Sequence, residues 1–104
     1  MELVYIQVFL EENRVLAWSS HRGPLNTGGA PWRHIFKAPG IRPVEQPARV
    51  MIHLAGDFES VTSDERMMLL DTAQSAGYGV ARIETGEPLL EPEEAYGLLL
   101  VPFT

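Results

Sequence analysis

The sequence predicts an α+β fold, a two-layer sandwich of about five strands with one main helix, in the order β-β-(long loop)-β-α-β-β. Runs of apolar, β-branched and aromatic residues recur along the chain and are typical of strands. One segment carries both the start signal and the stop signal of a helix. The chain has 104 residues, 45% of them apolar, which suits one core and a single domain over residues 1–104.

The first two strands are expected at Leu3–Leu10 and Val15–Ser19. Leu3–Leu10 is apolar at nearly every position, as in a central strand that is covered on both faces. The residues between the two strands include Asn13, a residue type that tolerates the left-handed conformation of a tight hairpin loop. The two strands are therefore expected to form a hairpin.

Residues 21–48 are expected to form a long loop. Five of the eight prolines in the chain lie here, and this spacing is incompatible with a regular helix or a central strand. The piece Trp32–Lys37 could form one helical turn or a brief strand, with Pro31 placed well for a helical start. Structureless loops of this length are uncommon in compact domains and are usually functional or mobile.

The second half of the chain is predicted to add a strand, a helix and two more strands. After the third strand, Arg49–Ala55, the pair Thr62 and Glu65 has the spacing of a capping box, which predicts a helix over residues 63–76. Gly77 supplies the stop signal. The last two strands are expected at Tyr78–Glu84 and Ala95–Phe103. The strands on either side of the helix could be parallel through a crossover or antiparallel.

The charge is segregated along the sequence. The formal net charge is −6, and residues 1–13, 14–53 and 54–104 carry −3, +5 and −8. The total argues against a general nucleic-acid binder, but the loop over residues 21–48 is locally positive. Arginine outnumbers lysine seven to one, a bias typical of GC-rich codons that indicates a bacterial or phage source.

No catalytic, metal or cofactor motif stands out. Cysteine is absent, so a disulfide scaffold, a thiol nucleophile and a zinc-thiolate site are excluded. His21, His34 and His53 lack the spacing of a helical metal site. No apolar stretch approaches the roughly 20 residues of a membrane span, and the amino terminus lacks the features of a signal peptide. The expectation is a cytoplasmic protein without cofactor or membrane contact.

Two groups of residues are candidates for partner binding. The loop interleaves cations and aromatics, a combination found in protein hot spots and in single-strand nucleic-acid sites. These side chains could instead anchor the loop to the core while the cations point outward. A second group of carboxylates could be a solvated face or a mimic of nucleic acid. The candidates are Arg22, Trp32, Arg33, His34, Phe36 and Lys37 in the loop, and Glu87, Glu91, Glu93 and Glu94 in the acidic segment.

The function predicted from these features is that of a small, acidic, non-enzymatic interaction protein that binds a protein partner. A phage or bacterial inhibitor, immunity or accessory protein is the class that fits best. The alternative is a small enzyme or ligand-binding domain with a site near His53 and Asp57 under the loop of residues 21–48. A homodimer through an edge strand, at Val15–Ser19 or Ala95–Phe103, is a further expectation.

Overall fold

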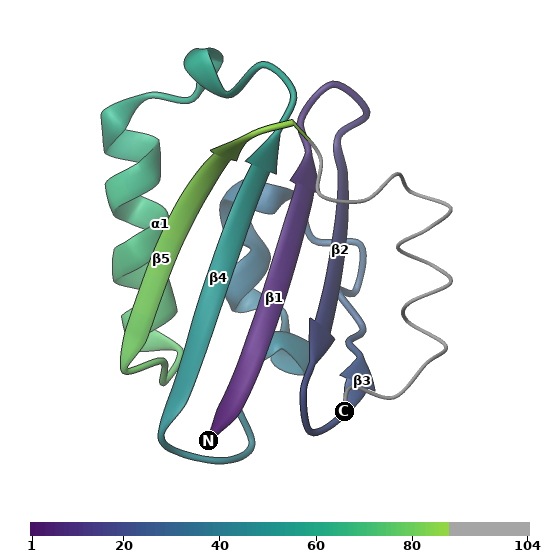
Figure 1. Cartoon of the computed structure of the whole chain (residues 1–104), viewed down its shortest axis with the longest axis vertical. Coiled ribbons are helices and arrows are strands. Elements are labelled where there is room, and N and C mark those ends of the chain that lie inside the picture. The colour runs from purple at the N-terminus through teal and green to yellow at the C-terminus, as the bar shows by residue number, and fades with distance from the viewer. Residues whose placement is uncertain (88–104) are drawn as a thin grey trace.

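The computed structural model describes residues 1–87 and confirms the α+β class. A five-stranded mixed sheet has the order β3-β2-β1-β4-β5, and one main helix packs on it (Figure 1). The strands are β1 (Glu2–Phe9), β2 (Arg14–Ser19), β3 (Gly23–Pro24), β4 (Ala48–Ala55) and β5 (Val80–Gly86). The helix is α1 (Ser63–Ser75), and three 3-10 turns are η1 (Trp32–Lys37), η2 (Pro39–Ile41) and η3 (Phe58–Ser60). The strand expected at Ala95–Phe103 lies outside the described residues.

Strand β1 is central, as its apolar composition predicts. It pairs antiparallel with β2 and parallel with β4. The predicted hairpin is confirmed, with Asn13 at a φ of 51° in its turn. Strand β5 pairs parallel with β4, so α1 belongs to a parallel crossover. The sequence left this choice open because the connection lengths allow either direction.

Helix α1 begins and ends where its local signals predict. The Thr62 side chain accepts a hydrogen bond from the Glu65 amide at 3.1 Å, and the Glu65 carboxylate accepts one from the Thr62 amide at 3.0 Å. These two bonds satisfy amides that the first turn of a helix leaves unpaired. At the other end, Gly77 adopts a φ of +115°, a conformation that L side chains rarely adopt.

Replacing Thr62 with alanine is expected to destabilise the fold by about 1 kcal/mol, because one side of the capping box is lost. Urea unfolding at pH 7 measures the change. Ser75→Ala, in the exposed last turn of the same helix, is the matched control. Equal unfolding midpoints for the two variants would contradict a stabilising cap.

The sheet separates two clusters of apolar side chains. On the helix face, β1 and β4 side chains pack under α1 and η1, and the cluster includes Ile6, Ile52, Leu69 and Trp32. Phe9, Leu16 and Trp18 form a smaller cluster, with Tyr5 packed against it. Side chains alternate along a strand, so this smaller cluster lies on the opposite face, called the second face below.

The loop of residues 21–48 folds against the helix face. Its piece Trp32–Lys37 forms the 3-10 turn η1, with Pro31 at the position just before it. Pro24 also takes part in the two-residue strand β3, which pairs with the end of β2. The sequence did not indicate β3 because two residues carry no period, and proline is tolerated there only because the strand lies at the sheet edge.

Strand β5 begins two residues later than predicted. The prediction included Tyr78 because of its strand propensity, but the Tyr78 side chain is 2% exposed and packs in the core. Its amide donates to Ala73 at the end of α1, and its hydroxyl donates to the carbonyl of Ile41. Tertiary packing therefore holds Tyr78 in the turn between the helix and the strand.

Candidate functional site

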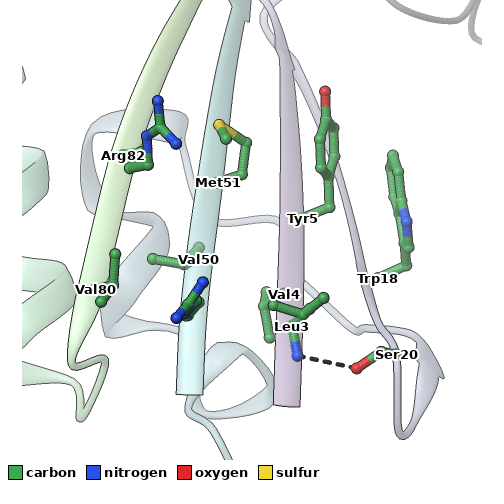
Figure 2. A pocket seen from close by; sticks show the side chains of 10 residues that line it. Leu3, Val4, Tyr5, Trp18, Ser20, Val50, Met51, Val80 and Arg82 are labelled. Atoms are coloured by element: carbon green, nitrogen blue, oxygen red, sulfur yellow. Dashed lines mark hydrogen bonds between the residues drawn. The ribbon is translucent and has the colours of Figure 1, made fainter. Parts of the chain in front are cut away.

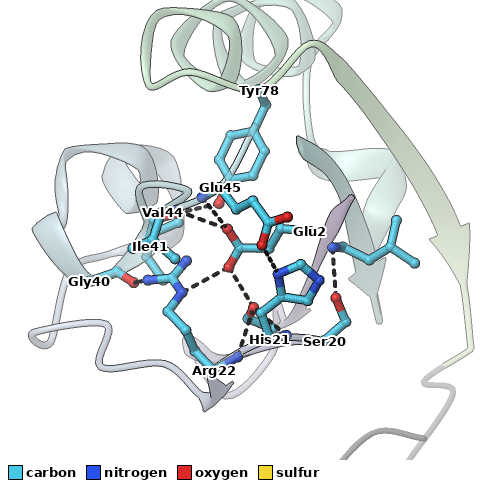
Figure 3. Close-up of polar contacts among 11 residues, drawn as sticks. Glu2, Ser20, His21, Arg22, Gly40, Ile41, Val44, Glu45 and Tyr78 are labelled. Atoms are coloured by element: carbon cyan, nitrogen blue, oxygen red, sulfur yellow. Dashed lines mark hydrogen bonds and ion pairs between the residues drawn. The ribbon is translucent and has the colours of Figure 1, made fainter. Parts of the chain in front are cut away.

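A buried ion pair ties the start of the long loop to the first strand. The Glu2 carboxylate is fully buried, and it accepts hydrogen bonds from Ser19 Oγ at 2.6 Å and from Arg22 Nε at 2.8 Å (Figure 3). The Val44 amide donates to the other carboxylate oxygen at 2.9 Å. The Arg22 guanidinium also donates to the Gly40 carbonyl at 3.1 Å. Two distant parts of the loop thus meet at one carboxylate.

The surroundings of Glu2 favour its charged form. Burial alone would raise the pKa of Glu2, but hydrogen bonds from Ser19, Arg22 and Val44, with the Arg22 charge, hold the pKa below its ordinary value. The nearby Tyr78 hydroxyl has a raised pKa, chiefly because it is buried. Both groups have partners within the fold, so the cluster acts as a structural clamp on the loop. Arg22, a candidate for partner binding, belongs to this clamp.

The aromatic candidates of the loop are core residues. Trp32 and Phe36 are 3% and 4% exposed and lie in the helix-face cluster. Arg33 covers Trp32, with its guanidinium 4.2 Å from the ring centroid, and forms an ion pair with Glu65. Because these three side chains are engaged inside the fold, the anchoring interpretation of the loop describes them better than partner contact.

The remaining loop candidates, His34 and Lys37, are exposed on η1. Among the acidic candidates, Glu87 is exposed at the end of the described chain, and Glu91, Glu93 and Glu94 lie outside the described residues. Of the predicted set, His34 and Lys37 on η1 and Glu87 after β5 are therefore exposed, and no hydrogen bond or ion pair within the described part of the chain joins them.

His53 does not lie under the long loop. The side chains before and after it on β4, Ile52 and Leu54, point into the helix-face cluster with η1, so His53 points to the second face. His53 is 4% exposed, with Nε2 at 2.8 Å from the Glu87 carbonyl and Nδ1 at 3.9 Å from the Glu84 carboxylate. The loop of residues 21–48 packs on the helix face and so does not cover His53, and a site near His53 and Asp57 stays a prediction.

Asp57 is exposed beyond the end of β4. Within residues 1–87, no group of three or more histidine and carboxylate side chains is placed to hold a metal ion. The same part of the chain contains no helix that is long and apolar enough to cross a membrane.

The second face carries a pocket of about 540 Å³ that the sequence did not predict (Figure 2). Apolar side chains form most of its lining, and two arginines contribute to it. Leu3 is 52% exposed and Val80 is 43% exposed. The stacked rings of Tyr5 and Trp18, 4.7 Å apart, lie along one side. The lining residues are Leu3, Val4, Tyr5, Trp18, Ser20, Arg49, Val50, Met51, Val80 and Arg82.

The charges at this pocket come from strands β4 and β5. Arg49 and Arg82 are both exposed, and the register places Arg82 opposite Met51 on the same face. Burial first, and then the nearby Glu84 charge, together raise the pKa of the Tyr5 hydroxyl to about 12. Tyr5 therefore stays neutral at physiological pH, and the pocket lining carries a positive charge.

The sequence contained a signal for this pocket, but only a weak one. Leu3–Leu10 is apolar on both of its faces, so its exposed end at Leu3 could not be distinguished from its buried middle. The alternation of Arg49 and Met51 with the buried Val50 and Ile52 does mark a face with polar character.

Comparison of the chain with protein-family models, with curated proteins and with solved structures found no match.

Proposed function

We propose that this chain is a small, non-enzymatic protein-binding module whose contact surface is the second-face pocket. The observation that carries the proposal is the combination of exposed Leu3 and Val80 with the guanidiniums of Arg49 and Arg82 around one concave site. Apolar anchors, aromatic rings and arginines are the side chains that dominate the energy of protein interfaces. An exposed apolar site of this kind on a small domain favours an interaction role.

The side chains of the pocket are suited to bind a segment of a partner protein that contains both acidic and apolar residues. Its floor offers apolar surface for a leucine or an aromatic side chain. Each guanidinium can form a bidentate pair with a carboxylate. The chain carries a net charge of −6, so two arginines on this face form a local positive site in an acidic molecule. Such a module fits the inhibitor, immunity or accessory class that the composition favours.

Selection from a displayed peptide library, with the full chain as bait, tests this proposal. The enriched peptides are expected to combine carboxylates with leucine or aromatic residues. Their affinity should fall about tenfold for the double variant Leu3→Ser with Arg49→Gln, because one apolar contact and one charged contact are removed. Isothermal titration at two salt concentrations measures the affinity and the electrostatic share of binding.

The matched control is the double variant Val44→Ser with Arg42→Gln. Val44 is 69% exposed and Arg42 is also exposed, and both lie in the long loop, away from the pocket lining. The control should bind like the wild type. Peptides that bind both double variants equally, or a library that yields no binder, would overturn the proposal. A binder displaced by a synthetic peptide of residues 88–104 would also overturn it, because the pocket would then fit the chain's own acidic, apolar segment.

A further inference from the structure

Strand β5 lies at one end of the sheet, and among residues 1–87 it pairs only with β4 (Figure 1). Val80, Arg82, Glu84 and Thr85 are exposed along its length. Its sequence contains no proline or lysine, the residues that commonly block pairing at a sheet edge. The outer side of β5 therefore offers backbone donors and acceptors to another strand.

We propose that β5 pairs antiparallel with β5 of a second copy, with the two-fold axis at Ile83. In this register Arg82 lies opposite Glu84 of the second copy, and Glu84 lies opposite Arg82 of that copy. Directly opposed side chains on one face are about 5 Å apart at Cβ, so the pairing creates two equivalent ion pairs. The two sheets join into one, with both α1 helices on the same side.

The charges select this register over its neighbours. An axis at Arg82 would place Arg82 opposite itself, and an axis at Glu84 would place Glu84 opposite itself. Like charges directly opposite each other are destabilising. Of these three axes, only the one at Ile83 places unlike charges opposite each other at both positions.

Both charged side chains are available for the contact. Arg82 forms no ion pair with another residue of the described part. The Glu84 carboxylate is 47% exposed, and its contact to His53 within the same copy is long, at 3.9 Å. The register with β4 places Arg82 and Glu84 opposite Met51 and His53, on the second face. Helix α1 packs on the other face and does not cover these charges.

Sedimentation velocity of the full chain over a concentration series tests the proposal by charge reversal. Arg82→Glu places two carboxylates opposite each other at both symmetric positions, and Glu84→Arg does the same with two guanidiniums. Each single variant is expected to raise the dimer dissociation constant at least tenfold. The double variant Arg82→Glu with Glu84→Arg restores unlike pairs and should dimerise like the wild type.

An equimolar mixture of the two single variants gives a sharper readout. In a mixed dimer, each reversed residue again faces an unlike charge, so association should return even though neither variant dimerises alone. Controls with the same charge changes elsewhere are Arg42→Glu in the loop and Glu12→Arg in the β1–β2 turn, and both should dimerise like the wild type. Circular dichroism verifies that each variant is folded.

Three results would overturn the inference: a wild-type chain that stays monomeric, single variants that dimerise like the wild type, or a mixture that fails to associate. The proposed function has a separate test, because the peptide experiment changes Leu3 and Arg49 and leaves β5 intact.

Discussion

Replacing Trp32 with alanine is expected to destabilise the fold by about 4 kcal/mol, because a large core side chain is removed and a cavity remains. Trp32 is 3% exposed and lies in the cluster that joins η1 to the sheet. A domain of this size has a total stability of about 5–15 kcal/mol, so the variant should unfold at a much lower urea concentration. Unfolding followed by circular dichroism measures the change.

The control for Trp32→Ala is His34→Ala, which changes an exposed residue of the same 3-10 turn and should leave the midpoint nearly unchanged. An unchanged midpoint for Trp32→Ala, accompanied by loss of binding to a partner, would contradict the structural role of Trp32. That result would indicate that the loop of residues 21–48 is the main contact surface.

Replacing Glu2 with glutamine is expected to cost about 3 kcal/mol at pH 7, because Arg22 then keeps a partly buried charge without its carboxylate. The folded-state pKa of Glu2 is lowered. Its contribution is therefore fully present above the unfolded-state pKa of about 4.3 and is lost as the pH falls through the lower folded-state pKa. The stability difference between wild type and variant should be constant between pH 6 and 8, as a rough window, and should shrink in acid.

Urea midpoints across this pH range measure the effect of Glu2→Gln. Glu12→Gln, in the exposed β1–β2 turn, is the matched control and should show no such dependence. A difference between wild type and Glu2→Gln that persists unchanged in strong acid would show that the charge of Glu2 does not stabilise the loop.

Local signals predicted the parts of the fold that depend on few residues. The capping box of Thr62 and Glu65 determines where α1 begins, and Asn13 permits the tight turn of the first hairpin. The apolar run of β1 predicted its central place in the sheet. Each of these features follows from a residue type at a defined spacing, so no knowledge of distant contacts was needed.

The features that the sequence did not predict depend on distant contacts. Glu2 is one of three glutamates in an acidic start to the chain, and nothing nearby indicates that Arg22 and Val44 would surround it. Tyr78 has strand propensity, yet its hydrogen bond to Ile41 holds it outside β5. In both cases the contacts join segments that lie 20 or more residues apart.

The candidate site likewise combines features that local sequence indicates with features that depend on distant contacts. The sequence predicted binding by cations and aromatic residues of the loop, whereas the pocket is lined by arginines and aromatic residues of the strands. The sequence did not show which of these side chains face solvent, because Trp32 and Arg33 look the same in sequence whether they contact a partner or the core. The strand register that brings Arg49 and Arg82 to one face with Leu3 exists only in the assembled sheet.

The most direct test of the central claim, that the second face and not the long loop is the contact surface, is a nuclear magnetic resonance titration. Isotope-labelled full chain is titrated with one selected acidic, apolar peptide, and backbone amide shifts are mapped. We expect the largest changes at Leu3, Tyr5, Arg49, Met51 and Arg82. Changes confined to His34, Lys37 and their neighbours on η1 would contradict the claim.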